Sequence, residues 1–378
     1  MKPASLYRLF MLMVLSTISY NLLAANGTPK IIIGYVGGYR GLIKPGMVDP
    51  KKITHLNYAF VNVIGNRAVL SREKTDTVNL RNLVLLKKIN PDLKILISIG
   101  GWTWSGGFSD AALTDTSRQA FAASAIAIAR RFDLDGIDID WEYPDMAGNG
   151  NINRKQDKQN YTLMFAELRK QLTELGLQLH KPMLLTTATG GFANFLRHTE
   201  MDKVSAYLDY INLMTYDYFG NGSAIHHTNL YASKTYAGRD NADDAVTAYL
   251  AMGVPASKLV LGVAFYGRLF QLTDTAKKGL GDISLKHLRQ LGYDMIQDSL
   301  LNNKPAGFIA YRDTAAMAPY LFNTISHQFI TYDDPWSIDN KCKYVMQHQL
   351  AGVMFWEYDS DPKSYLLDEV NKDLNNHH

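Results

Sequence analysis

The stretch FDLDGIDIDWEYP, residues 132–144, carries three acidic residues at alternate positions, Asp138, Asp140 and Glu142. The positions between them hold large apolar residues: Ile137, Ile139 and Trp141. A period of two predicts a β-strand, because successive side chains of a strand point to opposite faces. The three carboxyl groups would then share one face, about 6.6 Å apart along the strand. Carboxylates this close repel one another, so we expect at least one to keep its proton near neutral pH, as acid catalysis requires.

Two other interpretations of the acidic row are open. A solvated edge strand would carry acidic residues without any catalytic role, but the bulky apolar face argues for burial. Several neighbouring carboxylates also suit Mg²⁺ or Ca²⁺. We favour the catalytic interpretation, which needs no metal ion, and we predict no cofactor.

Composition narrows the class of protein. The 378 residues are 47% hydrophobic, and the net charge is only +3. This balance is that of an ordinary globular protein with a large core, and α/β barrels commonly reach this length. No block of basic residues is present, so nucleic acid is not an expected partner. The single cysteine, Cys342, rules out an intramolecular disulfide framework and a cysteine-based metal site.

Residues 1–25 resemble a secretory signal peptide, with a basic start, an apolar run and a small-residue end at Ala24-Ala25. An uncleaved membrane anchor is the alternative, although the run is short for a span. We therefore expect a secreted, extracellular protein whose mature part, within residues 26–378, is monomeric and does not enter a membrane.

Apolar runs and helical patterns alternate along the rest of the chain. The eight predicted strands are Lys30–Tyr35, Thr54–Val63, Leu93–Ile99, the acidic stretch, Met183–Thr189, Tyr207–Tyr216, Lys258–Tyr266 and Leu350–Trp356. The predicted helices are Leu80–Ile89, Thr116–Phe132 with Ser117 as a cap, Gln159–Leu175 stopped by Gly176, Asn241–Met252 and Tyr365–Asn371. Eight such units predict an α/β fold, a closed (β/α)₈ TIM barrel. An open doubly wound sheet is the alternative, but the expected GxGxxG loop is missing.

The gap between strands seven and eight is too long for a simple loop. We expect a small α+β insertion over residues 268–334, at the C-terminal face of the barrel. It would contain a helix at Leu285–Leu291 and two β segments, Gly307–Tyr311 and Gln328–Tyr332. The insertion would form one wall of a groove.

Catalytic groups of such barrels lie at the C-terminal ends of the strands. Aromatic and polar residues gather at these ends here, and flat rings suit the apolar faces of sugars. The candidate residues at strand ends are Tyr35, Phe60, Gly101, Trp102, Tyr143, Met214, Tyr216, Asp217, Tyr266, Arg268 and Trp356.

Four motifs in the expected order give the chain a resemblance to the family 18 glycoside hydrolases, the chitinase family. The family signature DGxDxDxE is matched over residues 135–142, and SxGG by Ser98, Gly100 and Gly101. The further matches are Met214-x-Tyr216-Asp217, the Tyr-Gly-Arg at residues 266–268, and Trp356. The resemblance covers roughly residues 31–367, and the insertion is similar to that of the deep-cleft chitinases.

The resemblance implies hydrolysis with retention but without a protein nucleophile, an exception to the usual scheme of two carboxylates. Glu142 would protonate the glycosidic oxygen, and the acetamido carbonyl of the substrate would attack to form an oxazolinium. Asp140 would hold the acetamido N–H and share a proton with Asp138. Tyr216 and Asp217 would orient the acetamido group.

The remaining candidates are expected to bind sugar. Trp356 would form the floor of the reacting subsite, with Tyr35, Phe60 and Met214 as its walls. Trp102 would stack on the leaving-group side, and Arg268 would contact sugar hydroxyl or carbonyl groups.

Three departures and two rival functions remain. Tyr39 stands where many members carry Trp, the loop after strand six lacks a Trp, and no chitin-binding module is visible, so we expect soluble oligosaccharides or loosely packed polymer as substrate.

The pair His226-His227 is interpreted as part of a surface loop rather than a zinc site. The rival functions are an endo-β-N-acetylglucosaminidase acting on N-glycans and a non-catalytic chitin-binding lectin. The lectin is disfavoured because Glu142 is present.

Overall fold

The computed structural model describes residues 29–220, 222–238, 240–273, 278–303, 305 and 307–375. The predicted signal peptide lies outside these residues. The barrel strands are β1 (Ile31–Gly37), β2 (His55–Ile64), β4 (Lys94–Gly100), β5 (Gly136–Asp140), β6 (Leu184–Gly190), β7 (Tyr210–Met214), β8 (Leu259–Ala264) and β14 (Gly352–Trp356). They pair in this order, all parallel, and β1 pairs with both β14 and β2, so the sheet closes. The predicted (β/α)₈ barrel is therefore confirmed.

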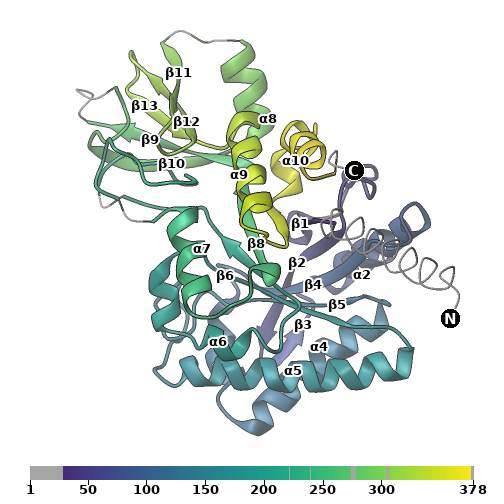
Figure 1. Ribbon diagram of the computed structural model, residues 1–378. Helices are drawn as coiled ribbons and strands as arrows, with labels where there is room; N and C mark the ends of the chain where they lie inside the picture. The colour runs from purple at the N-terminus through teal and green to yellow at the C-terminus, as the bar shows by residue number, and fades with distance from the viewer. Residues whose placement is uncertain are drawn as a thin grey trace, which may run out of the picture.

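Helices cover the outside of the barrel (Figure 1). They are α2 (Glu73–Val84), α3 (Phe108–Ala111), α4 (Asp115–Arg131), α5 (Asp157–Leu179), α6 (Met201–Val204), α7 (Ala242–Ala251), α9 (Pro335–Gln347) and α10 (Tyr365–Asn375). Short 3₁₀ turns occur at Gly38–Arg40, Leu85–Lys88, Ser105–Gly107, Ala193–Arg197, Ala256–Lys258 and Tyr358–Ser360. A short strand, β3 (Arg67–Val69), pairs antiparallel with the end of β2. No helix in the described part of the chain is long and apolar enough to cross a membrane.

Side chains along each barrel strand point alternately outward and inward, so the protein has one core outside the barrel and another within it. On β1, Ile32 and Val36 pack outward in the large core beneath the helices, whereas Ile33 and Tyr35 belong to a small cluster within the barrel. On β5, Ile137 and the other apolar residues of the acidic stretch pack outward in the same large core. The carboxyl groups of the acidic stretch therefore face the inside of the barrel.

The insertion between β8 and β14 is a five-stranded antiparallel sheet with the order β10-β9-β13-β12-β11. Its strands are β9 (Tyr266–Leu272), β10 (Ser284–Gly292), β11 (Phe308–Asp313), β12 (Ala318–Asn323) and β13 (Gln328–Thr331). A short helix, α8 (Tyr293–Met295), and a π-helical segment, Ile296–Asn302, follow β10. In Figure 1 the sheet stands beyond the end of β8, next to α9.

Several predicted elements are wrong in type or extent. The stretch Leu285–Leu291 belongs to strand β10 rather than to a helix, because it pairs along the whole of β9. The sequence prediction missed β12, and Tyr266 begins β9 instead of ending β8. Helix α5 continues through Gly176 to Leu179 and ends where His180 adopts a left-handed φ of 54°.

The cap of α4 also differs from the prediction. Thr114 is the N-cap, and its side chain accepts a hydrogen bond from the Ser117 backbone N–H. The Ser117 hydroxyl in turn accepts from the Thr114 N–H, which makes a capping box.

Candidate active site

A cleft of about 1200 Å³ opens at the C-terminal ends of the barrel strands. Its lining includes twelve of the fourteen predicted site residues: Tyr35, Phe60, Trp102, Asp140, Glu142, Tyr143, Met214, Tyr216, Asp217, Tyr266, Arg268 and Trp356. One wall comes from the insertion, through Arg289 to Gly292 on β10 and through Asp294 and Met295 after it. The cleft is therefore formed jointly by the barrel and the insertion.

The other two predicted residues, Asp138 and Gly101, lie behind the lining. Gly101 has a φ of +80°, and a Cβ at this position would lie 2.6 Å from the Phe60 ring. Its backbone N–H donates to the Asp140 carbonyl oxygen at 2.7 Å. Glycine is thus required by the backbone conformation and by the close approach of Phe60.

Asp138 lies deepest in the acidic row and is fully buried. Its carboxylate accepts hydrogen bonds from Tyr35 Oη at 2.8 Å, Ser98 Oγ at 2.7 Å, Thr186 Oγ1 at 2.5 Å and Asn212 Nδ2 at 3.3 Å. Burial raises the pKa of Asp138, and these donors partly offset that rise. Proton sharing with Asp140 stays a prediction, since these four hydrogen bonds join Asp138 to other side chains.

The Asp140 carboxyl group lies in surroundings that disfavour its charged form. Its Oδ1 is buried and has no hydrogen-bond partner within the described residues. Burial and then the neighbouring charges of Glu142 and Asp138 raise its pKa well above the usual range. Because Asp140 lines the cleft, this unpaired oxygen is a candidate partner for a polar group of a ligand.

Glu142 lies just past the end of β5, and its backbone N–H donates to Ser105 Oγ at 2.8 Å. Only 9% of its surface is exposed. Burial is the main cause that raises its pKa to about 7, with Asp217 adding to the rise and the Tyr143 hydrogen bond opposing it. A carboxylic acid that is half protonated near neutral pH can donate a proton and later remove one.

Asp217 has the opposite electrostatic environment. Arg268 Nε and Nη2 donate to its two carboxylate oxygens at 2.8 and 2.6 Å. Nδ1 of His227 lies 3.6 Å from Oδ1 of Asp217. Burial acts against ionisation, but His227 and Arg268 outweigh it and lower the pKa of Asp217. The site therefore combines a carboxylate that stays charged with one that titrates near neutrality.

The histidine pair was placed wrongly by the sequence prediction. His226 and His227 are fully buried rather than in a surface loop. Nε2 of His226 lies 3.4 Å from Asp313 of the insertion, and His227 reaches Asp217 of the cleft. Within the described residues, no group of three or more His, Cys, Asp or Glu side chains is arranged to hold a metal ion.

Aromatic rings also line the cleft. The Trp356 ring stacks on Phe60 at 5.4 Å between centroids and lies parallel to Tyr39 at 6.4 Å. Trp102 stands at the rim with 51% of its surface exposed and meets Tyr143 edge to face. The two Trp rings thus offer flat apolar surfaces at separate positions of the cleft, as a chain of pyranose rings would need.

Three polar residues at the Trp356 end were not among the predicted site residues. The Glu357 side chain is buried and accepts hydrogen bonds from Tyr39 Oη and Arg40 Nη2, each at 2.5 Å. All three line the cleft. The sequence signal was available, because Glu357 directly follows Trp356, but its partners are more than 300 positions away.

These features define a class: a (β/α)₈-barrel hydrolase with an acidic row and an aromatic cleft suited to sugar chains. The family model "Glycosyl hydrolases family 18" matches residues 31–361. The chain belongs to this family.

Similar proteins carry chitinase and N-acetylglucosaminidase names. Chitinase A1 of Niallia circulans is 35% identical over 86% of this chain and 55% of its own length. This chain therefore spans about half of that relative. A family 18 N-acetylglucosaminidase structure from Paenibacillus barengoltzii is 38% identical with a TM-score of 0.84, covering 91% of this chain and 99% of that one. Chitinase ChiA74 from Bacillus thuringiensis is 31% identical with a TM-score of 0.84, covering 92% and 70%.

Proposed function

We propose that the chain is a retaining chitinase that hydrolyses β-1,4-linked N-acetylglucosamine polymers or oligomers. The observation that carries the proposal is Glu142, a buried acid with a pKa of about 7 at the mouth of a sugar-sized aromatic cleft. A general acid works best when its pKa lies near the working pH. Chitinase names among the relatives point to the same substrate class.

In the proposed reaction, Glu142 gives its proton to the glycosidic oxygen as the bond to the leaving sugar breaks. The acetamido carbonyl of the bound sugar attacks the anomeric carbon and forms an oxazolinium. Asp140, whose Oδ1 lacks a protein partner in the described structure, accepts the acetamido N–H. The ionised Glu142 then removes a proton from water, which opens the ring with overall retention.

Tyr216 and Asp217 orient the acetamido group in this scheme: the Tyr216 hydroxyl can donate to the acetamido oxygen, whereas the charged Asp217 carboxylate can only accept a hydrogen bond. Tyr216 is buried in the cleft beside Asp140, and its hydroxyl lies 3.6 Å from the Met354 sulfur. The Arg268 pair fixes the Asp217 carboxylate in direction and charge. Arg268 is thus engaged with Asp217, and a contact to sugar remains a prediction for it.

Product analysis on chitohexaose tests the proposal. A chitinase yields di- and trisaccharides, an exo-acting N-acetylglucosaminidase yields monosaccharide, and an endo-β-N-acetylglucosaminidase cleaves a high-mannose glycopeptide instead. The monosaccharide outcome has support from the 38% identity to an N-acetylglucosaminidase structure. Cleavage of the glycopeptide without any action on chitohexaose would overturn the proposal.

We also propose that the protein is exported and monomeric. The basic start, the apolar run and the small residues at Ala24-Ala25 support export, because this pattern is that of a signal peptide. N-terminal sequencing of protein recovered from the culture medium tests cleavage after Ala24 or Ala25, and light scattering tests the oligomeric state.

A further inference from the structure

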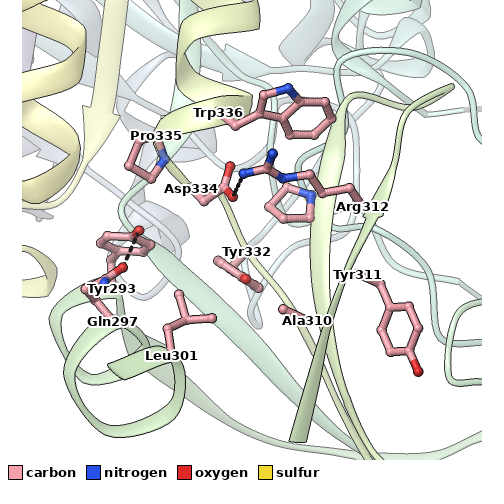
Figure 2. A pocket seen from close by; sticks show the side chains of 11 residues that line it. Tyr293, Gln297, Leu301, Ala310, Tyr311, Arg312, Tyr332, Asp334, Pro335 and Trp336 are labelled. Atoms are coloured by element: carbon pink, nitrogen blue, oxygen red, sulfur yellow. Dashed lines mark hydrogen bonds and ion pairs between the residues drawn. The ribbon is translucent and has the colours of Figure 1, made fainter. Parts of the chain in front are cut away.

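A second hollow, of about 460 Å³, lies outside the catalytic cleft, between the insertion sheet and the start of α9. Figure 2 shows Trp336 and Arg312 on one side of it, Tyr293 and Gln297 on the other, and Tyr332 between them. Its volume is in the range of pockets that hold small organic groups. None of these residues takes part in the site described above.

The floor of the hollow is aromatic. Tyr293 and Tyr332 are buried, with ring centroids 6.4 Å apart and planes inclined by 32°. Trp336 is half-buried, at the second position of α9. The two buried tyrosines shape the floor, and the partly exposed Trp336 ring is the aromatic surface that suits the C–H face of a pyranose.

Fixed polar groups border these rings. The Arg312 guanidinium lies 4.7 Å from the Trp336 ring centre, and its Nη2 lies 3.3 Å from Asp334 Oδ2. The Arg312 side chain is nevertheless 54% exposed. The Arg312 guanidinium has five N–H donors, and within the described residues its side chain forms one hydrogen bond, to Asp334. The other donors therefore remain for a ligand. Gln297 adds an amide whose Oε1 accepts from Tyr293 Oη at 3.0 Å.

The short segment 292–297 contributes residues to both the cleft and the hollow. Gly292, Asp294 and Met295 line the cleft, whereas Tyr293 and Gln297 of the same segment line the hollow. A polymer that occupies the cleft can therefore have a neighbouring stretch, or a neighbouring chain of the same material, close to the hollow. Two linked contacts raise the overall affinity well above that of either contact alone.

We infer that this hollow is a second sugar-binding site, which takes an N-acetylglucosamine unit of a polymeric substrate and anchors the enzyme to it. The inference rests on the proposed function for the identity of the sugar. Trp336 contacts the sugar ring above the floor that the two tyrosines form, and Arg312 with Asp334 bonds its hydroxyl or acetamido groups. Short substrates fill the cleft alone, so the hollow affects only long chains.

The test compares a short and a long substrate in the full chain. Arg312→Ala and Trp336→Ala should leave kcat/KM for chitotriose within about twofold of the parent. The same changes, made in a Glu142→Gln background, should weaken binding to swollen chitin by about three- to tenfold, the worth of one stacking contact. Trp336→Phe, which keeps a ring, should recover part of that loss. Ile309→Ala is the control, because Ile309 is exposed on β11 but does not line the hollow.

The outcomes separate this inference from the proposed function. Hydrolysis of chitotriose together with unchanged chitin binding in Arg312→Ala and Trp336→Ala overturns the second site and leaves the chitinase proposal standing. No hydrolysis of any chitooligosaccharide by the parent overturns the proposed function itself. If Trp336→Ala loses activity on chitotriose through misfolding, the exposed Arg312→Ala and Arg312→Glu variants decide the question. Equal losses in Ile309→Ala would also contradict the second site.

Discussion

Glu142→Gln should change how the stability of the protein depends on pH, as well as remove catalysis. The glutamate carboxyl is buried, and its pKa is raised from 4.5 to about 7. The unfolded chain therefore loses this proton at lower pH than the folded protein does. Below pH 4.5 both states are protonated and burial carries no penalty, whereas above pH 7 the folded protein must hold a buried charge.

The magnitude follows from the two pKa values. One pKa unit corresponds to about 1.4 kcal/mol, so the wild type loses about 3 kcal/mol in total as the pH rises from 4.5 past 7. Most of this loss, about 2–3 kcal/mol, falls between pH 5 and pH 8. Glutamine carries no titrating proton and escapes this loss. Removal of the Glu142 charge also lowers the pKa of Asp140, which adds to the effect in the same direction.

Urea unfolding at pH 5 and pH 8 measures the effect for the wild type and Glu142→Gln. Relative to the wild type, the variant should gain about 2–3 kcal/mol in unfolding free energy between these two pH values. Glu174→Gln is the matched control, because Glu174 is exposed on α5, and the same chemical change there should give a constant difference. In parallel, kcat/KM of the wild type should fall about tenfold per pH unit above pH 7, as the acid loses its proton.

A stability difference between Glu142→Gln and the wild type that is equal at pH 5 and pH 8 would refute this reasoning. It would mean that Glu142 does not hold its proton in the folded protein. A kcat/KM profile that stays flat from pH 6 to pH 9 would lead to the same conclusion.

Three further predictions concern two residues of the cleft and one buried ion pair outside its lining. Arg268→Met leaves Asp217 without its cation, so the pKa of Asp217 should rise and kcat/KM on chitotetraose should fall by about 30-fold or more in steady-state assays. Lys341→Met leaves a buried aspartate uncompensated and should cost about 3–5 kcal/mol in urea unfolding, whereas the exposed Lys343→Met should cost under about 0.5 kcal/mol. Trp102→Ala should raise KM about three- to tenfold with little change in kcat, because an exposed stacking surface is lost.

The barrel could be predicted from the sequence because its signals are local. Each parallel strand is buried on both faces and reads as an apolar run, and the acidic stretch keeps a strict period of two. The strand-end rule then gathers residues such as Trp102, Asp217 and Trp356 from distant parts of the chain into one cleft.

The insertion was harder to predict, because its strands have weak local signals. In the stretch Leu285–Leu291 a leucine recurs at every third position, which fits a helix, and only its pairing with β9 makes it a strand. Register shifts in this pair remove the period of two that a regular strand would show. The prediction that His226 and His227 lie at the surface was wrong for a similar reason. The two residues are buried in contact with Asp313, which is distant in the sequence, and with Asp217.

The end of a helix was also hard to predict from the sequence. Gly176 was expected to stop α5, since glycine is common just after a helix, yet the helix continues because His180 provides the left-handed cap. The contacts of Glu357 could not be predicted from the sequence, because Tyr39 and Arg40 meet it only through closure of the barrel between β1 and β14.

The central claim is that Glu142 works with the substrate's own acetamido group and that no protein nucleophile is used. Its most direct test follows the anomeric form of the first products from chitohexaose by NMR, before mutarotation, in the wild type. The proposed mechanism predicts β-anomers, because two displacements at the anomeric carbon restore its configuration. Initial products in the α-anomeric form would contradict it.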